Sequence, residues 1–326
     1  MRRVCAVLVV AVAVAAALSP RTWGKQTRLV YGFAGVKQLH YAANLIALDR
    51  LRDRGYETVP VFLPRPELAA QALIRGEVDL ARLDPITAST AVARGARLVM
   101  LAALGTSEWV LVTPKTITVP RQLARKRIAV HSLSSMSNTV VQYAIRKHGI
   151  VAPQVLVIPG SPARAQALLQ GEIDATSLFL IDAIRLQMLA PDRFHVLIDF
   201  KDLPVVDAVV VTRRDWLAAH QLEAEDFLRV LLETHRRIAA GPEWTVTRTQ
   251  ALFPDQDATF VAAVVRAYVA RGIWDPNGGI PGPATIQEMI RFLKSVEMVP
   301  ATAPDVAEVY ADLRPLRAVL SRIGRK

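Results

Sequence analysis

The sequence AQALIRGEVDLA at residues 70–81 recurs at residues 165–176 as AQALLQGEIDAT. Seven of the twelve positions are identical, and two others exchange one branched apolar residue for another. The copies begin 95 residues apart, which is too far for a solenoid repeat and suits a small lobe of alternating strands and helices. The repeat therefore predicts two lobes of similar construction.

Each copy has the pattern of a short helix, a glycine and a strand. Small and apolar residues follow helical spacing up to Gly76 in the first copy and Gly171 in the second. Glycine ends a helix readily because the left-handed cap conformation brings no Cβ clash. Strands are predicted to begin at Val78 and Ile173. Two such lobes leave a cleft between them, and ligand pockets tend to lie at domain interfaces.

Residues 1–24 have the pattern of a secretory signal peptide. A basic pair precedes an unbroken apolar run at residues 4–18, which is shorter than the roughly 20 residues a membrane-spanning helix needs. Cleavage is expected within residues 19–24, with an uncleaved anchor as the alternative. Cys5 is the single cysteine of the chain, so its removal would exclude disulfides and cysteine–metal sites from the mature protein. The predicted location is the periplasm.

The chain has 326 residues and a formal net charge of +11. Its basic residues are scattered and do not alternate with aromatic residues, so no nucleic-acid partner is predicted. Segments that alternate between strand and helix patterns predict mainly parallel sheets. Residues 109–113 (WVLVT) and 207–212 (DAVVVT) are similar and are predicted to be two strands that cross between the lobes.

The predicted domain organisation follows from these crossings. It comprises the signal peptide at 1–24, the first part of lobe 1 at 25–112, lobe 2 at 113–206, and a return to lobe 1 with C-terminal helices at 207–326.

This layout resembles the solute-binding proteins of ABC importers, in the group that takes sulfonates, taurine, nitrate and thiamine-precursor pyrimidines. The resemblance rests on the signal peptide, the repeated G-E-[VI]-D-[LA], the residues QL at 122–123 before KRIAV at 126–130, and GI at 149–150. It covers residues 28–212 well. It implies an α/β fold of the type II periplasmic-binding-protein class: two mixed, mainly parallel sheets flanked by helices, joined by two crossing strands, with a helical C-terminal segment.

The resemblance also implies a function. A monomer of this kind captures a small solute, with an anion favoured here, in the cleft between its lobes and delivers it to a permease in the inner membrane. An exported sensor that uses the same cleft is an alternative. A pyrimidine-forming enzyme of thiamine precursor synthesis is a further alternative, although such enzymes look to use a cysteine-rich segment that this chain lacks.

In open α/β sheets, ligands bind beyond the carboxyl ends of the strands. This rule selects the loops at residues 33–38, 82–87, 131–137 and 177–179, and the helix starts nearby favour an anion. Residues 106–108 lie beside a crossing and are expected to line the hinge side. The candidate ligand-binding residues are Phe33, Gln38, Arg82, Asp84, Ser132, Ser134, Ser135, Ser177, Phe179 and Asp207.

Several of these residues have a structural alternative. One serine of residues 132–135 could cap the following helix while another binds ligand. Arg82 could bind a sulfonate or carboxylate through its planar fork, or pair with Asp84 at the surface. Asp84 is expected to cap the helix that starts at Pro85. The aromatic candidates, Phe33 and Phe179, could stack on a ligand or pack in the core.

The sequence contains no motif for catalysis. It has no HExxH, no G-x-S-x-G and no P-loop, so no catalytic residue, metal or cofactor is predicted. Asp79 and Asp174, one in each copy of the repeat, are interpreted as structural residues at strand starts.

Overall fold

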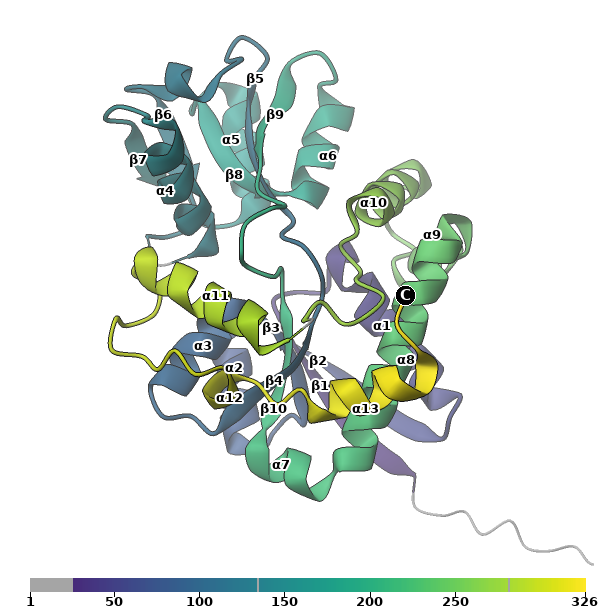
Figure 1. Cartoon of the computed structure of the whole chain (residues 1–326). Coiled ribbons are helices and arrows are strands. Elements are labelled where there is room, and N and C mark those ends of the chain that lie inside the picture. Colours follow the sequence, from purple (N-terminus) through teal and green to yellow (C-terminus); the bar gives the residue numbers. More distant parts are fainter. Residues whose placement is uncertain (1–25, 134, 281) are drawn as a thin grey trace, which may run out of the picture.

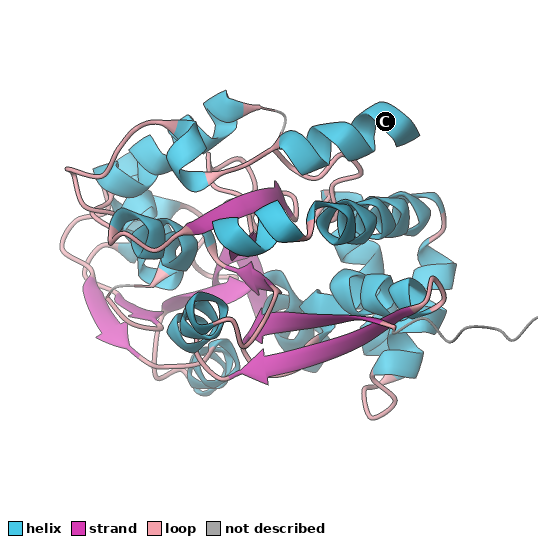
Figure 2. Ribbon diagram, turned by 90° about the horizontal axis from the view of Figure 1, so that it is seen from below, coloured by secondary structure: helices cyan, strands magenta, loops and turns pink. Residues whose placement is uncertain are grey.

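The structure is a computed structural model that describes residues 26–133, 135–280 and 282–326. The predicted signal peptide and the candidate Ser134 therefore lie outside the described residues. The described chain forms two five-stranded sheets with helices packed around them (Figures 1 and 2). This arrangement confirms the predicted fold class.

Lobe 1 is built on a sheet with the strand order β2-β1-β3-β10-β4. β1 is parallel to β2 and β3, whereas β10 runs antiparallel to both of its neighbours. The strands are β1 (Thr27–Ala34), β2 (Tyr56–Leu63), β3 (Leu80–Leu83), β4 (Leu98–Ala103) and β10 (Val209–Arg213).

Lobe 2 is built on a sheet with the order β7-β6-β8-β5-β9. It repeats the first pattern, because β6 is parallel to β7 and β8 while β5 runs antiparallel to β8 and β9. The strands are β5 (Trp109–Pro114), β6 (Arg127–Val130), β7 (Gln154–Val157), β8 (Ala175–Phe179) and β9 (Phe194–Asp199).

The helices divide in the same way. Lobe 1 has η1 (Leu39–Tyr41), α1 (Ala42–Arg52), α2 (Pro66–Arg75) and α3 (Pro85–Ala93). Lobe 2 has η2 (Pro120–Leu123), α4 (Met136–His148), α5 (Ser161–Gln170) and α6 (Leu180–Leu189). The C-terminal segment adds α7 (Arg214–Ala219), α8 (Gln221–Ala240), α9 (Pro242–Leu252), α10 (Ala258–Arg271), α11 (Pro283–Ser295), α12 (Ala307–Tyr310) and α13 (Arg314–Ile323) to lobe 1.

The repeat has the same structure in both lobes. Gly76 ends α2 and Gly171 ends α5, each with φ 77° in the left-handed region, as predicted. The carboxylate of Asp79 accepts the backbone N–H of Val30 at 2.8 Å, and that of Asp174 accepts the N–H of Arg127 at 2.9 Å. In return, the N–H of Asp79 donates to the carbonyl of Val30, and the N–H of Asp174 donates to the carbonyl of Arg127. The structural interpretation of both aspartates is confirmed.

The predicted starts of the two repeat strands are wrong by two residues. β3 begins at Leu80 and β8 at Ala175, because the residues before them turn the chain and dock the aspartate against the first strand of the lobe. The preceding apolar side chains, Val78 and Ile173, are nevertheless buried in the core.

The predicted crossing strands exist as β5 and β10, but each lies wholly within one sheet. The chain passes between the lobes just before each strand, at residues 104–108 and 200–208, which we call the two links. The links run side by side, because Leu104 N–H donates to Ala208 O at 2.9 Å and Asp207 N–H donates to Gly105 O at 3.2 Å. Figure 1 shows both links passing between the two sheets.

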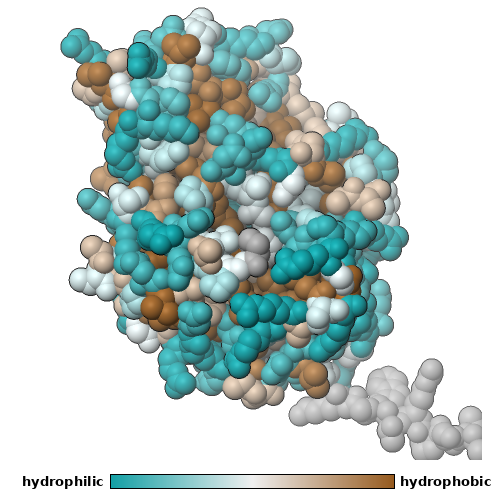
Figure 3. All heavy atoms as spheres, in the orientation of Figure 1, coloured by the Kyte–Doolittle hydropathy of each residue, from teal (hydrophilic) through white to brown (hydrophobic). Residues whose placement is uncertain are grey.

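The lobes also touch away from the links. Ile181 of α6 is buried in the hydrophobic core of lobe 1, and Phe179 packs against that core. On another side, the Tyr143 ring of α4 meets the Phe292 ring of α11 edge-on, with 5.9 Å between centroids. In Figure 3, apolar and hydrophilic residues alternate on the surface of lobe 2, at the top, whereas the surface of lobe 1, below it, is mainly hydrophilic. Among the described residues, no helix has the length and apolar character to cross a membrane.

Candidate functional site

The side chain of Arg82 lies between the sheet of lobe 1 and the links. Its Nη2 atom is 2.7 Å from Oδ2 of Asp207, and only 11% and 4% of the two side chains are exposed. The predicted surface pair with Asp84 is wrong. Asp84 instead caps α3, because its carboxylate accepts from the backbone N–H and the hydroxyl of Thr87. Its predicted role as a helix cap is confirmed, and burial raises its pKa.

The Arg82 guanidinium has a buried donor nitrogen besides the one that pairs with Asp207. Its Nε is buried without a hydrogen-bond partner among the described residues, and the same is true of Nδ1 of His40. The Arg82 guanidinium also lies over the Tyr41 ring, 5.0 Å from the centroid. Burial and the positive charge of Arg82 lower the pKa of His40 well below its usual value, so His40 is neutral. Buried polar atoms normally have a partner, so these two nitrogens make the surroundings of Arg82 a candidate site for a bound group.

Glu108 places a second carboxyl group beside Asp207. It is 1% exposed and accepts a hydrogen bond from the hydroxyl of Tyr268 in α10. The backbone N–H of Glu108 donates a hydrogen bond to the carboxylate of Asp207. Burial, reinforced by the charge of Asp207, raises the pKa of Glu108 to about 8, so this carboxyl holds a proton at neutral pH. Burial also raises the pKa of Asp207, while Arg82 opposes that shift.

We call Arg82, Asp207, Glu108, His40 and Tyr268 the interlobe cluster. Lobe 2 reaches it through Phe179, whose ring lies 5.7 Å from that of His40 and 4.3 Å from that of Trp109. The cluster therefore gathers one arginine, two carboxyl groups and a neutral histidine at the contact between the lobes.

The serines of lobe 2 form a buried network of their own. Ser177 is fully buried, and its Oγ lies 2.9 Å from Oγ of Ser137 and donates to the Ser137 carbonyl. The Ser137 hydroxyl also accepts the N–H of His131. Arg164 donates to the carbonyls of Ser177 and Ile158, and burial lowers its pKa to about 10. These contacts place Ser177 in the supporting structure of lobe 2.

The other candidates stand in different positions. Ser135 precedes α4 but its hydroxyl donates to the carbonyl of Ser132 at 2.7 Å and makes no helix cap. Phe33 was predicted on a loop, but it lies in β1, because that strand continues to Ala34. Its ring is fully buried and stacks on Phe62 at 4.9 Å, so it belongs to the core. Gln38 is half-buried at the start of η1.

The structure thus brings together only part of the predicted site. Arg82 pairs with Asp207, and Phe179 reaches the same cluster through His40. By contrast, Ser177, Phe33 and Asp84 have structural partners. Sequence reasoning placed Glu108 beside a crossing without assigning it a contact, and it missed the roles of His40 and Tyr268. Neither of the last two lies in a recognisable motif, and only the folded chain brings α10 to the links.

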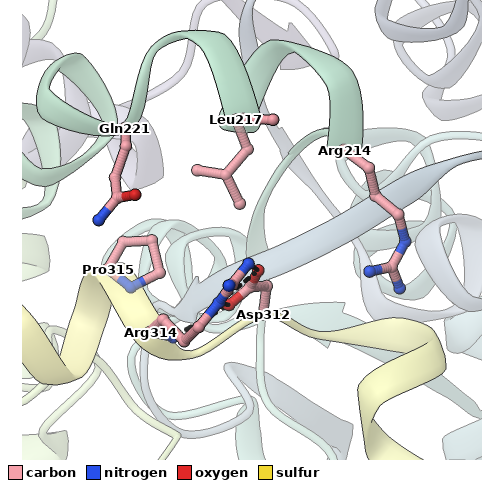
Figure 4. Close-up of a pocket in the computed structure, with 7 residues that line it drawn as sticks. Arg214, Leu217, Gln221, Asp312, Arg314 and Pro315 are labelled. Carbon is pink, nitrogen blue, oxygen red and sulfur yellow. Dashed lines mark hydrogen bonds and ion pairs between the residues drawn. The ribbon is translucent and has the colours of Figure 1, made fainter.

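Two cavities lie elsewhere, on the side of lobe 1 where α7 meets α13. One, of about 150 Å³, is lined by Arg214, Leu217, Ala218, Gln221, Asp312, Arg314 and Pro315 (Figure 4). The other, of about 290 Å³, shares Arg214, Asp312 and Arg314 and continues along α12. Arg314 pairs with Asp312 at 2.5 Å, and Arg214 donates to the carbonyls of Glu308 and Val309. Neither cavity is lined by a residue of the interlobe cluster.

The family profile described as NMT1/THI5 like matches residues 59–244, which is more than half of the chain. The chain belongs to the NMT1/THI5-like family. The matched region begins in β2, ends in α9 and includes three members of the interlobe cluster, Arg82, Glu108 and Asp207. His40 and Tyr268 lie outside it.

This NMT1/THI5-like chain is similar to a characterised protein and to several solved structures. It is 26% identical over 257 residues to the taurine-binding periplasmic protein of Escherichia coli strain K12, covering 73% of this chain and 77% of the relative. The aliphatic sulphonate binding protein SsuA from Escherichia coli superposes with a TM-score of 0.69 at 18% identity, covering 89% and 93% of the two chains. The nitrate-binding protein NrtA from Synechocystis PCC 6803 gives 0.71 at 11% identity, covering 91% and 89%. These structures confirm the type II periplasmic-binding-protein fold.

Proposed function

We propose that this protein binds a small organic solute carrying both an anionic group and an amine, in the interlobe cluster, and delivers it to an ABC importer. The observation that carries the proposal is the buried Arg82, which has an unused Nε donor and two carboxyl groups beside it. The protein is proposed to act as a periplasmic monomer that recognises its solute and then docks on an inner-membrane permease.

The charges of the cluster favour a ligand with two opposite charges. Asp207 already balances Arg82, and Glu108 is neutral at pH 7, so the site has little net charge. A simple anion that approaches Arg82 also approaches Asp207, and a simple cation meets the reverse problem. A zwitterion can place its anion at Nε of Arg82 and its amine at Glu108 and Asp207, so each of its charges meets a group of opposite polarity.

The relatives support this reading. The taurine-binding protein, which is 26% identical to this chain, is named for a compound that carries an amine and a sulfonate. The structural neighbours are named for sulfonate and nitrate, which are anions. All three are named as binding proteins, which favours binding over catalysis. An oxyanion suits Arg82 because the guanidinium fork matches its oxygens.

Burial of the cluster implies that the lobes must separate to admit a solute. We propose that the links are the hinge of this motion and that they divide the two lobes. The predicted boundary at 206/207 falls within the second link, whereas the one at 112/113 falls inside β5, so the first division is placed in the link at residues 104–108. Ligand then shifts the population toward a closed form, as in other hinged two-lobe proteins.

Calorimetry on the chain from residue 25 tests the proposal. We would compare taurine with ethanesulfonate, which lacks the amine, and with ethylamine, which lacks the anion; nitrate completes the set. We expect taurine to bind at least about tenfold more tightly than either fragment, since each lost charged contact weakens binding by about 1.5 kcal/mol or more. Taurine that is recovered chemically unchanged after incubation with the protein would show binding without turnover.

Other results would change the proposal. Equal affinity for taurine and ethanesulfonate would remove the amine and leave an anion-binding site. If none of the compounds bound at millimolar concentration, the zwitterion site would be wrong. A pyrimidine ligand or a protein partner would then be the next candidates to screen.

A further inference from the structure

Arg271 lies where lobe 1 contacts the first link and the end of β9, directly before the second link. It is the last residue of α10 in lobe 1, and its guanidinium donates to the carbonyl of Ser107 from Nε at 3.1 Å and from Nη2 at 2.8 Å. Nη2 also reaches the carbonyl of Trp109, the first residue of β5, at 3.3 Å. These bonds hold the first link where it enters the sheet of lobe 2.

The same guanidinium holds the chain where it leaves that sheet. Asp199 is the last residue of β9, and its carboxylate lies 2.6 Å from Nη2 and 2.8 Å from Nη1 of Arg271. β9 and β5 are neighbours in the sheet, with Asp199 opposite Val110. A single lobe 1 side chain therefore bridges the incoming and outgoing strands of lobe 2.

The backbone around Arg271 packs closely on the first link as well. The hydroxyl of Thr106 donates to the Arg271 carbonyl at 3.4 Å. Gly105 has φ +99°, and a Cβ built there would lie 2.0 Å from the carbonyl oxygen of Ile273. The close approach admits no larger residue than glycine, so the turn after α10 and the first link are in direct backbone contact.

We infer that Arg271 is a positioning residue for ligand retention, which holds the two lobes in their closed relation by binding the first link and the end of β9 from lobe 1. The inference rests on the proposed function, and it concerns a residue outside the region that the family profile matches. Arg271 does not contact the solute. It acts through the first link, which carries Glu108, and through Asp199, from which the chain enters the second link that carries Asp207.

The energetic reason lies in how the guanidinium is buried. The Arg271 side chain is 8% exposed, while Asp199 is 43% exposed. A buried guanidinium with two carbonyl acceptors and one carboxylate is well satisfied, and charge-assisted bonds of this kind are stronger than neutral ones. Opening the hinge moves the sheet of lobe 2 relative to α10, so it strains or breaks these bonds. Their loss opposes opening and slows escape of the solute.

Stopped-flow ligand release from the full mature chain tests the clamp, with taurine as the probe. We would compare Arg271→Met, which keeps the apolar stem, with Asp199→Asn, which leaves Arg271 in place. Both should speed dissociation, Arg271→Met by about tenfold or more, while the association rate changes little. The double variant should release no faster than Arg271→Met, since both changes break one interaction.

Arg266→Met is the matched control. Arg266 lies on the same helix and pairs with Glu243 at 2.9 Å, but both side chains are more than half exposed and lie away from the links. Its dissociation rate should equal that of the wild type. An unchanged dissociation rate in Asp199→Asn and Arg271→Met would overturn the clamp, as would an equal acceleration in the control. A merely structural loss would lower the active fraction and melting temperature without changing the rate of release.

A second measurement separates this inference from the proposed function. Small-angle scattering of the unliganded protein should give a larger radius of gyration for Arg271→Met and Asp199→Asn than for the wild type and Arg266→Met. That comparison needs no ligand. If taurine failed to bind the wild type, the proposed ligand would be wrong while the clamp was still tested; equal radii in all four proteins would reject the clamp.

Discussion

Oδ2 of Asp207 lies 2.7 Å from Nη2 of Arg82, although 125 residues separate the two in the chain. Arg82 belongs to a strand of lobe 1, and Asp207 belongs to the link that returns from lobe 2. The pair therefore joins the candidate ligand contact to the hinge. A solute that engages the free Nε of Arg82 meets a guanidinium already oriented by the hinge, so binding and lobe position are physically connected.

Replacing Arg82 should affect binding and stability together. Arg82→Ala is expected to weaken taurine binding by about 1.5–3 kcal/mol, the range for a hydrogen bond to a charged group. It should also destabilise the fold by about 3–5 kcal/mol, because Asp207 is left buried without its partner. Calorimetry and chemical denaturation measure the two effects.

The double variant Arg82→Met with Asp207→Leu separates these effects. It removes both charges, so stability should recover toward the wild type while binding stays lost. Recovery of taurine binding in this variant would show that the pair serves the fold alone.

The pKa of Glu108 predicts how binding depends on pH. With its pKa raised to about 8, Glu108 is protonated at pH 7 and becomes an anion above pH 8. Affinity for an amine-bearing solute should therefore rise between pH 6 and pH 9, while affinity for ethanesulfonate should not rise. Glu108→Gln, which stays neutral, should abolish the rise. A wild-type affinity for taurine that is flat over this range would contradict the assignment of Glu108 to the amine.

The repeated aspartates should matter for stability in the same way in each lobe. Asp79→Ala and Asp174→Ala each leave a strand N–H without its carboxylate acceptor, which should lower the free energy of unfolding by about 1–3 kcal/mol. The matched controls are Glu77→Ala and Glu172→Ala, two exposed residues of the same motif. They should change stability by less than about 0.5 kcal/mol. Equal effects in the aspartate and glutamate variants would reject the structural role.

His235 should make the fold sensitive to acid. It is fully buried in α8, its Nδ1 lies 2.8 Å from the carbonyl of Asp275, and Nε2 has no partner among the described residues. Burial lowers its pKa from 6.5 to about 4. A depressed folded-state pKa stabilises the fold above pH 6.5, and this stability is lost as pH falls from 6.5 to 4.

The loss should be on the order of 3 kcal/mol, since one pKa unit corresponds to about 1.4 kcal/mol. Denaturation of the wild type and His235→Asn at several pH values measures it, because asparagine can still donate to the Asp275 carbonyl without titrating. The variant should lack this part of the acid dependence. Curves that ran parallel for the two proteins would show that another group is responsible.

Local pattern determined the parts of this protein whose causes are local. Glycine after a helix, proline at a first helical turn and aspartate before it act over a few residues, so Gly76, Gly171 and the cap at Asp84 could all be predicted. The twelve-residue repeat likewise predicted two similar lobes, because both copies dock an aspartate on the first strand of their own lobe.

The tertiary structure decided which polar side chains meet. Nothing near Arg82 in the sequence indicates Asp207 as its partner, and the nearest carboxylate, Asp84, was the wrong choice because the adjacent helix uses it as a cap. Glu108 and Tyr268 are 160 residues apart and meet only because α10 packs on the links. The sequence determined the two lobes and their repeated local structure. The packing of the C-terminal helices against the links, which no local spacing encodes, decided the charges, burial and hinge contacts of the site.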